Sequence, residues 1–337
     1  MKKLLLFSAL CVNVLFVQSF YVLREGVKYE CSGFNGAARV SIVTVDDNVE
    51  HIVVPSGVKD PQTDSLYVVR QFWSSGNGGR NVKSITLPNV VFWLGQRGLG
   101  HTVFANMPKL ESVILPNSLK VIGASSFYNC SSLKTIRIPD SVTTIEKEAF
   151  NGCTGLKTVD IPNSVTSISS NAFYMCDSLR RVRMANGVTS IGDNAFGVCG
   201  QLEEVVLPTS LTNLGAAFSY CPIKTMVYLT DSVPCAVASN TLKTVETVCV
   251  LESMVSKFKE TEYWRDKKIK PYDGIPLNTA LDLNGDWKIN SADVVVTYNW
   301  ISDSIVLEDG EKNPADLNQD GTVNSADVVG LYNYIEE

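Results

Sequence analysis

A repeat of 23 residues fills the middle of the chain and constrains its fold more than any other feature. Leucines, phenylalanines and cysteines each recur at this interval in a column of their own. The columns are Leu110, Leu133, Leu156, Leu179 and Leu202; Phe104, Phe127, Phe150, Phe173 and Phe196; and Cys130, Cys153, Cys176 and Cys199. A unit this short cannot bury its own apolar face, whereas stacked copies bury one another. The repeat therefore predicts a solenoid.

One unit shows how each turn of the solenoid is expected to run. Apolar residues alternate from Leu133 to Ile138, which predicts a short strand. Pro139 ends that strand because proline cannot donate a hydrogen bond to a ladder. Val142 and Ile145 turn the chain inward again, and Ala149-Phe150 fills the far side of the coil.

The cysteine column could be interpreted as metal ligands or disulfides, but a buried ladder of small apolar side chains explains it better. The chain has no Cys-x-x-Cys pair, and no histidine accompanies the column. Cys235 and Cys249 lie off the column and could form a disulfide in a secreted protein.

The interval and the consensus of the units resemble leucine-rich repeats of the BspA-like type. The resemblance implies an α/β-type repeat solenoid with short strands and irregular or short helical returns. We expect an N-terminal cap with a degenerate first repeat at residues 20–81, repeats at 82–230 and a C-terminal cap at 231–275. A Gly-rich insertion at Gly95–Gly100 interrupts the array, and Phe258 to Trp264 resembles a closing helix.

The C-terminal segment contains two copies of a twelve-residue loop rich in oxygen side chains, 34 residues apart. Calcium takes six to eight oxygen ligands, and its EF-hand loops supply them from positions 1, 3, 5, 7, 9 and 12. The expected ligands are Asp282, Asn284, Asp286, Lys288, Asn290 and Asp293 in the first loop and Asp316, Asn318, Asp320, Thr322, Asn324 and Asp327 in the second. Lys288 and Thr322, at position 7, would bind through their backbone carbonyls. The sequence thus predicts two calcium ions.

One residue of the first loop departs from the calcium-binding pattern. Trp287 replaces the glycine expected at position 6, where a tight turn favours positive φ, so the first site is expected to be weaker or distorted.

Residues 278–337 carry twelve Asp and Glu against two Lys, a net charge of −10, while the remainder of the chain carries 27 basic and 23 acidic residues. The segment is therefore a separate electrostatic unit.

A stripe with helical spacing follows each loop, while no entering helix precedes either one. This duplicated loop-plus-helix pattern at residues 278–337 resembles a type I-like dockerin, a small all-α module. The resemblance implies docking onto a cohesin domain through positions 10 and 11 of each loop and outward positions of the helices. These are Ser291, Ala292, Tyr298, Asn299, Ser325, Ala326, Tyr332 and Asn333. The near identity of the copies suggests binding in two orientations.

The first 19 residues have the features of a secretory signal peptide. Lys2 and Lys3 precede an apolar run from Leu4 to Val17, and a small-residue cleavage site follows. The run is short for a membrane anchor. We expect a secreted protein that is not transmembrane after cleavage, with attachment to a cell surface as an option. The overall net charge of −6 gives no indication of nucleic-acid binding.

The function expected from the sequence is non-catalytic binding or adhesion. Catalytic motifs such as Gly-x-Ser-x-Gly and His-Glu-x-x-His are absent from the sequence. The alternative is a cellulosome-type polysaccharide-degrading component with an unrecognised active site. A charged stripe on the expected strands is either a solvated face or an adhesive patch for a protein or glycan; it comprises Lys134, Arg137, Lys157, Arg180, Arg181, Arg183, Glu203 and Glu204.

Overall fold

The computed structural model describes residues 20–25, 27–34, 37–46, 48–59, 64, 66–74, 79–94, 103–232, 237 and 241–272. Four of the predicted features lie outside these residues. They are the signal peptide, the Gly95–Gly100 insertion, Cys235 of the suggested disulfide and the whole dockerin-like segment.

The N-terminal part is a cap of strands, most of them longer than those of the coils. It contains β1 (Phe20–Arg24), β2 (Val27–Phe34), β3 (Ala37–Val45), β5 (Gly57–Lys59) and β6 (Leu66–Ser74). β2 pairs antiparallel with both β1 and β3, and β5 pairs antiparallel with β6. β6 pairs in parallel with β3 on one side and with the first coil on the other, so it joins the cap to the solenoid. This cap covers the edge that the first coil would otherwise expose.

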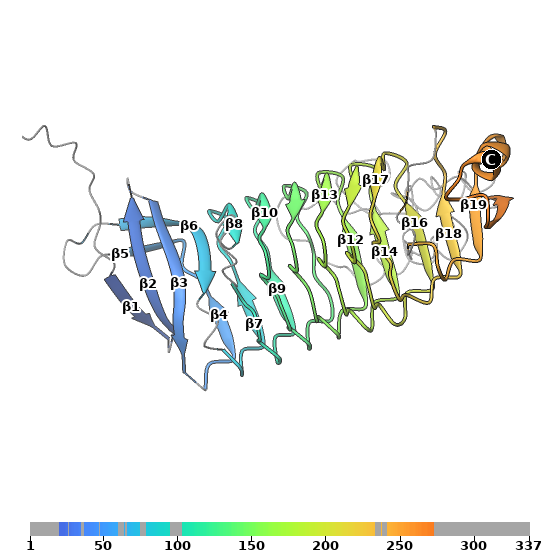
Figure 1. Cartoon of the computed structure of the whole chain (residues 1–337). Helices are drawn as coiled ribbons and strands as arrows, with labels where there is room; N and C mark the ends of the chain where they lie inside the picture. The colour runs from blue at the N-terminus through green and yellow to red at the C-terminus, as the bar shows by residue number, and fades with distance from the viewer. Residues whose placement is uncertain are drawn as a thin grey trace, which may run out of the picture.

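The solenoid that follows stacks two columns of parallel strands (Figure 1). The first column holds β4 (His51–Val53), β7 (Ser84–Thr86), β9 (Ser112–Ile114), β12 (Thr158–Ile161), β14 (Arg181–Met184), β16 (Glu204–Leu207), β18 (Thr225–Tyr228), β19 (Thr247–Val250) and β20 (Lys268–Pro271). The second holds β8 (Trp93–Leu94), β10 (Val121–Ile122), β11 (Thr144–Ile145), β13 (Ser167–Ile168), β15 (Ser190–Ile191) and β17 (Asn213–Leu214). The predicted repeat solenoid with short strands is confirmed, and its strands are parallel.

One predicted strand is shorter than expected. The alternating stretch from Leu133 to Ile138 contributes a single bridge, between Arg137 and Asp160, instead of a continuous ladder. The alternation still sets its side chains, because Ile136 and Ile138 are buried while Arg137 is exposed. The stretch therefore stays in register with β12 although it lacks the full hydrogen-bond pattern.

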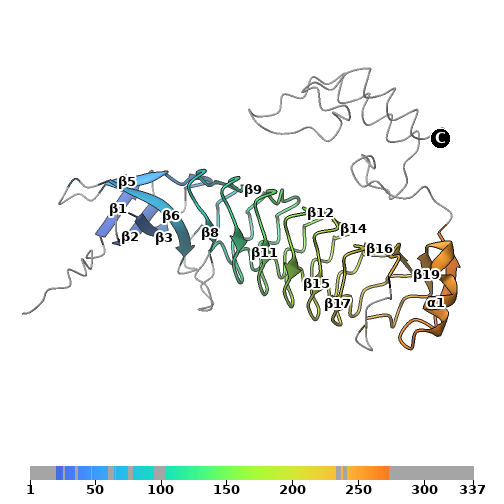
Figure 2. The same cartoon turned by 90° about the horizontal axis from the view of Figure 1, so that it is seen from above.

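The third side of each coil is formed by the turn that carries Ala-Phe, and Figure 2 shows these coils side by side. The phenylalanine rings stack along the axis: the centroids of Phe127, Phe150 and Phe173 are 5.1 and 5.0 Å apart, with interplanar angles of 7° and 8°. The Phe150 N–H donates to the carbonyl of Ala172 in the next coil at 2.7 Å. Ring stacking and backbone bonds thus act between the same neighbours.

The cysteine column is a buried ladder, as predicted. Cys130, Cys153, Cys176 and Cys199 are fully buried, and each thiol lies within hydrogen-bond distance of the backbone carbonyl of a phenylalanine in the preceding coil. Burial raises the pKa of the Cys130 thiol to about 12 and also raises the pKa values of Cys153 and Cys176. Neutral, buried thiols are poor nucleophiles and poor metal ligands.

We expect these thiols to resist iodoacetamide at pH 8 in the folded protein and to react once urea unfolds it, as measured by mass spectrometry of the peptides. Their raised pKa values also give stability that is present below the ordinary thiol pKa of 9.0 and decreases as pH rises toward about 12. Labelling of Cys153 without denaturant would contradict the buried ladder.

A short helical segment closes the C-terminal end of the described solenoid, and its helix ends at Glu260, earlier than the expected closing segment that runs to Trp264. β19 leads into η1 (Glu252–Met254) and α1 (Val255–Glu260), and β20 returns beside β19. Phe258 and Trp264 are fully buried and pack against Tyr228, with ring centroids 5.8 and 5.9 Å from it. The cap thus covers the last coil with aromatic side chains.

A backbone feature recurs two residues after each stacked phenylalanine. The residue there has a positive φ between 57° and 75° in six successive coils, at Asn106, Asn129, Gly152, Met175, Val198 and Tyr220. Asn and Gly tolerate this conformation, whereas a β-branched valine does so at a cost. The neighbouring coil holds it in place, because the Val198 N–H donates to the Ser219 carbonyl at 2.8 Å.

Replacing Val198 with asparagine should therefore raise the free energy of unfolding by about 1 kcal/mol, measured by urea denaturation. The reverse exchange, Asn129→Val, should lower it, because it adds strain and removes the 3.1 Å side-chain bond to Asn106. A Val198→Asn protein less stable than its parent would show that packing of the valine outweighs strain.

Candidate functional site

One surface of the solenoid presents charged side chains in register from coil to coil. The residue just before each strand position of the first column, from β4 to β19, forms what we call the edge column: Glu50, Lys83, Glu111, Lys134, Lys157, Arg180, Glu203, Lys224 and Glu246. Backbone bonds align its members; for example, the Arg180 N–H donates to the Lys157 carbonyl at 3.0 Å. Parallel neighbours of this kind lie about 4.8 Å apart.

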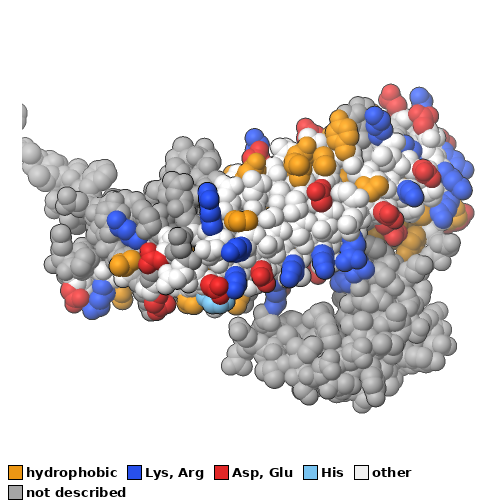
Figure 3. Space-filling model, turned by 90° about the horizontal axis from the view of Figure 1, so that it is seen from below, with side chains coloured by type: hydrophobic (Ala, Val, Ile, Leu, Met, Phe, Trp, Pro, Cys, Tyr) orange, Lys and Arg blue, Asp and Glu red, His pale blue; other side chains and the backbone are white. Residues whose placement is uncertain are grey.

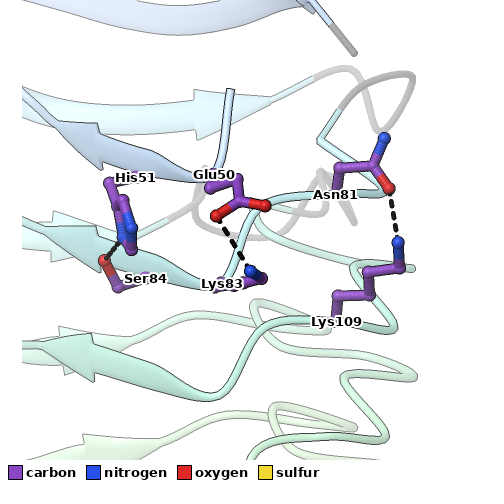
Figure 4. A network of polar contacts seen from close by, with 6 residues as sticks. All are labelled: Glu50, His51, Asn81, Lys83, Ser84 and Lys109. Carbon is purple, nitrogen blue, oxygen red and sulfur yellow. Dashed lines mark hydrogen bonds and ion pairs between the residues drawn. The ribbon is translucent and has the colours of Figure 1, made fainter. Parts of the chain in front are cut away.

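At its N-terminal end the edge column alternates in sign, and its first two members form an ion pair. Lys83 Nζ donates to Glu50 Oε2 at 2.8 Å, and this contact lowers the pKa of the Glu50 carboxyl and raises the pKa of Lys83. Figure 4 shows that the neighbouring contacts also join successive coils: His51 Nδ1 lies 2.8 Å from Ser84 Oγ, and Lys109 donates to Asn81.

Sequence reasoning missed this alternation. The first coils are longer than the repeat, so Glu50 and Lys83 are 33 residues apart instead of 23. A search at the repeat interval does not align them. Only the register of β4 with β7, which pairs His51 with Ser84, brings the two charges together.

In the middle of the solenoid the alternation stops and three cations follow one another. We call Lys134, Lys157 and Arg180 the cation column; all three side chains are exposed. Beside it, Arg137, Asp160 and Arg183 occupy the outward position two residues into the same strands, with Arg183 Nε 3.9 Å from Asp160 Oδ1. Figure 3 shows Lys and Arg side chains gathered along one edge of the solenoid.

The charged stripe predicted from the sequence does face outward. Lys134, Arg137, Lys157, Arg180, Glu203 and Glu204 are exposed, and Arg181 and Arg183 are half-buried. The change of sign also holds, since Glu203 and Glu204 follow Arg180 and Arg181 by one repeat.

The nearest approach to a catalytic arrangement in the described residues is the exposed His51–Ser84 pair. A serine nucleophile also needs a group that orients the histidine and donors that stabilise an oxyanion. Among the residues the structure describes, no carboxylate is hydrogen-bonded to the other ring nitrogen of His51, and Glu50 is held by Lys83. The pair is best explained as a polar contact between coils.

No group of three or more His, Cys, Asp or Glu side chains suited to a metal ion occurs within the described ranges. The predicted calcium ligands all lie outside those ranges: Asp282, Asn284, Asp286, Lys288, Asn290, Asp293, Asp316, Asn318, Asp320, Thr322, Asn324 and Asp327. The same holds for the predicted docking residues Ser291, Ala292, Tyr298, Asn299, Ser325, Ala326, Tyr332 and Asn333. Both sets stay predictions.

In the part of the chain covered by the structure, no helix has both the length and the apolar character needed to cross a membrane.

Comparison with known structures identifies leucine-rich repeat proteins as similar folds. A leucine rich cell surface protein from Faecalibacterium prausnitzii A2-165 matches with a TM-score of 0.51 and 24% identity, over 71% of this chain and 72% of that one. A Treponema pallidum leucine rich repeat protein matches at 0.40 and 22% identity, over 68% and 86%. A leucine-rich repeat protein from Bacteroides ovatus ATCC 8483 matches at 0.37 and 19% identity, over 68% and 70%. No curated protein matches the chain.

Two family models match separate parts of the sequence. Residues 97–224 match the BspA type leucine rich repeat region in six copies, and residues 280–336 match the dockerin type I domain. Type I dockerins bind calcium, and dockerin domains bind cohesins. The chain thus combines a BspA-type leucine-rich repeat region with a C-terminal type I dockerin domain.

Proposed function

We propose that this chain is a secreted, non-catalytic binding protein in which the solenoid holds a protein or glycan ligand and the dockerin attaches the chain to a cohesin-type partner in the presence of calcium. The observation that carries the proposal is the type I dockerin match at residues 280–336 on a chain that also contains a leucine-rich solenoid.

The chemistry of the two loops supports the calcium part. Each loop offers side-chain oxygens at five positions and a backbone carbonyl at a sixth, which matches the demand of a hard cation. Each also gathers three aspartates, whose carboxylates repel one another without a cation. Metal binding and folding of the dockerin are therefore coupled.

The shape and surface of the solenoid support the ligand part. Solenoids present extended surfaces because every coil contributes equivalent outward positions. The similar Faecalibacterium protein is described as a cell surface protein. That description and the signal-like first 19 residues favour a location outside the cell or at its surface.

The docking part is tested with a panel of purified cohesin domains and the full chain, by pull-down in calcium and in EDTA. Binding in calcium alone supports the proposal, and a panel without any binder contradicts it. Because the two loops are nearly identical, Ala292→Asp or Ala326→Asp alone should leave binding in the other orientation. Both substitutions together should abolish it, while Asp303→Ala, outside the loops, serves as the control.

The ligand part is tested by incubating the full chain with an array of glycans and surface proteins while following both retention and product release. Retention without products supports a binding protein. Release of cleaved sugars would instead establish the alternative, a polysaccharide-degrading component.

A further inference from the structure

We propose that the cation column binds a linear anionic polysaccharide that runs along the solenoid axis, with one acidic sugar group facing each coil. The inference rests on the proposed function, because it assigns a ligand class and a place to the binding solenoid. It is carried by the register of the three cations, by the interruption of the alternation and by the side chains that surround them.

The register places three positive charges on one line. The Lys157 N–H donates to the Lys134 carbonyl at 3.1 Å and the Arg180 N–H to the Lys157 carbonyl at 3.0 Å, so the three residues are direct neighbours in successive coils. A ligand lying along this line meets a cation about every 4.8 Å. A polymer with charges repeated along one direction fits such a row.

The stability of the solenoid does not require this row. Like charges directly opposite one another on neighbouring strands are destabilising. Elsewhere in the edge column the sign alternates, as at Glu50–Lys83, where the two side chains bind each other at 2.8 Å. Within the described residues, no ion pair relieves Lys134, Lys157 or Arg180. An anionic ligand would supply the missing countercharges.

The surrounding side chains favour a polysaccharide over a protein. Thr135, Thr158 and Arg181 flank the column on the outward face, and each can hydrogen-bond to sugar hydroxyl or carboxylate oxygens. The large apolar side chains exposed on this face, Val53 and Ile114, belong to earlier coils. Protein interfaces take their affinity mainly from buried aromatic and apolar anchors. The strand face of these three coils does not present any, because the exposed Met175 lies on the turn after Phe173.

The same absence disfavours single-stranded nucleic acid, which binds by stacking its bases on aromatic side chains. No aromatic side chain lies on the strand face that carries the cations, at residues 134–138, 157–161 and 180–184. The row is also bounded at both ends by carboxylates, because Glu111 precedes Lys134 and Glu203 follows Arg180 by one repeat. The site therefore accommodates a short acidic segment of a longer chain.

The test is isothermal titration calorimetry of the full chain in calcium with oligogalacturonates of increasing length. Affinity should rise with length, level off once the oligomer spans the three coils, and fall as salt is added. The fully methyl-esterified oligomers, which keep the sugar backbone and lose the charge, should not bind. A sulfated oligosaccharide of equal length shows whether carboxylate or sulfate is preferred.

The triple variant Lys134→Gln, Lys157→Gln, Arg180→Gln should bind about tenfold or more weakly. Its matched control is Lys120→Gln, Lys243→Gln, Lys259→Gln, which removes the same charge from exposed positions elsewhere and should bind like the parent. Equal binding by the two variants would overturn the proposal. So would equal binding of the methyl esters, or tighter binding of oligoglutamate or single-stranded DNA of equal charge.

A single variant separates binding from folding. Lys157→Glu restores the alternation between Lys134 and Arg180, so it should raise the melting temperature while it weakens oligogalacturonate binding. A variant that melts lower, or that binds as tightly as the parent, contradicts the inference. If no anionic oligosaccharide binds but the array finds another solenoid ligand and a cohesin still docks, the proposed function stands and only this inference fails.

Discussion

Replacing Phe150 with alanine should lower the free energy of unfolding of the solenoid by about 3–5 kcal/mol. Phe150 is fully buried, and its ring stacks on Phe127 and Phe173 in the two adjacent coils. Removing the ring loses both stacking contacts and leaves a cavity that the hydrogen-bonded coils on either side cannot readily close.

The effect should be large because a solenoid is stabilised by contacts between neighbouring coils. Phe150 lies in the interior of the ring stack, so its loss weakens two interfaces at once. The backbone bonds from Phe127 to Ala149 and from Phe150 to Ala172 remain possible, which confines the change to packing.

The measurement is urea denaturation followed by circular dichroism, with Tyr220→Ala as the matched control. Tyr220 is also an aromatic residue next to the stack, but its side chain is 79% exposed, so its loss should change stability by no more than about 0.5 kcal/mol. If the two variants lose the same stability, the phenylalanine stack is not a principal source of it.

The phenylalanine and cysteine columns illustrate what the sequence could predict. A fixed interval places equivalent residues on equivalent positions, and burial of Phe150 and Cys153 follows from stacking alone.

Other features depend on register or on strain and were not predictable in the same way. The antiparallel strands β1 to β3 lie outside the repeat, and no interval relates them to the coils. The positive φ at Val198 runs against the preference of its own side chain. The signal for it was indirect: Asn106 and Asn129 occupy the equivalent positions and favour that conformation.

The candidate site shows the same division. The strand alternation correctly placed Lys134, Lys157 and Arg180 on the outward face. The three like charges are an exception only when they are compared with the alternating charges of the first coils. In those coils the intervals between charged residues are longer than 23 residues, so the sequence alone does not show which charges are neighbours. The contrast between Glu50–Lys83 and the cation column is thus a result of the structure.

Removal of calcium should unfold the dockerin and leave the solenoid folded. The two parts are expected to differ in what stabilises them: the solenoid has a continuous apolar core, whereas each predicted calcium loop carries three aspartates that would repel one another without a cation. A ligand at 100 times its dissociation constant stabilises the folded state by about 2.7 kcal/mol per site. Two such sites would supply a large share of the stability of a module of this size.

In calorimetry we therefore expect two transitions in calcium and the loss of one in EDTA, with cohesin binding lost in parallel. The transition of the solenoid, followed through the reactivity of Cys153, should not move. Asp303→Ala, which changes the same segment outside the loops, should keep both transitions. An unchanged thermogram in EDTA would contradict the calcium sites.

The two sites should also differ in strength. Gly321 occupies position 6 of the second loop, where a positive φ costs glycine nothing, whereas Trp287 occupies it in the first loop. A strain of about 1–2 kcal/mol corresponds to a loss of roughly tenfold in affinity. Trp287→Gly should therefore raise the affinity of the first site by about that factor, and Asp316→Ala should destabilise the dockerin more than Asp282→Ala does. Equal calcium affinities in the parent would show that the turn accepts Trp287 without strain.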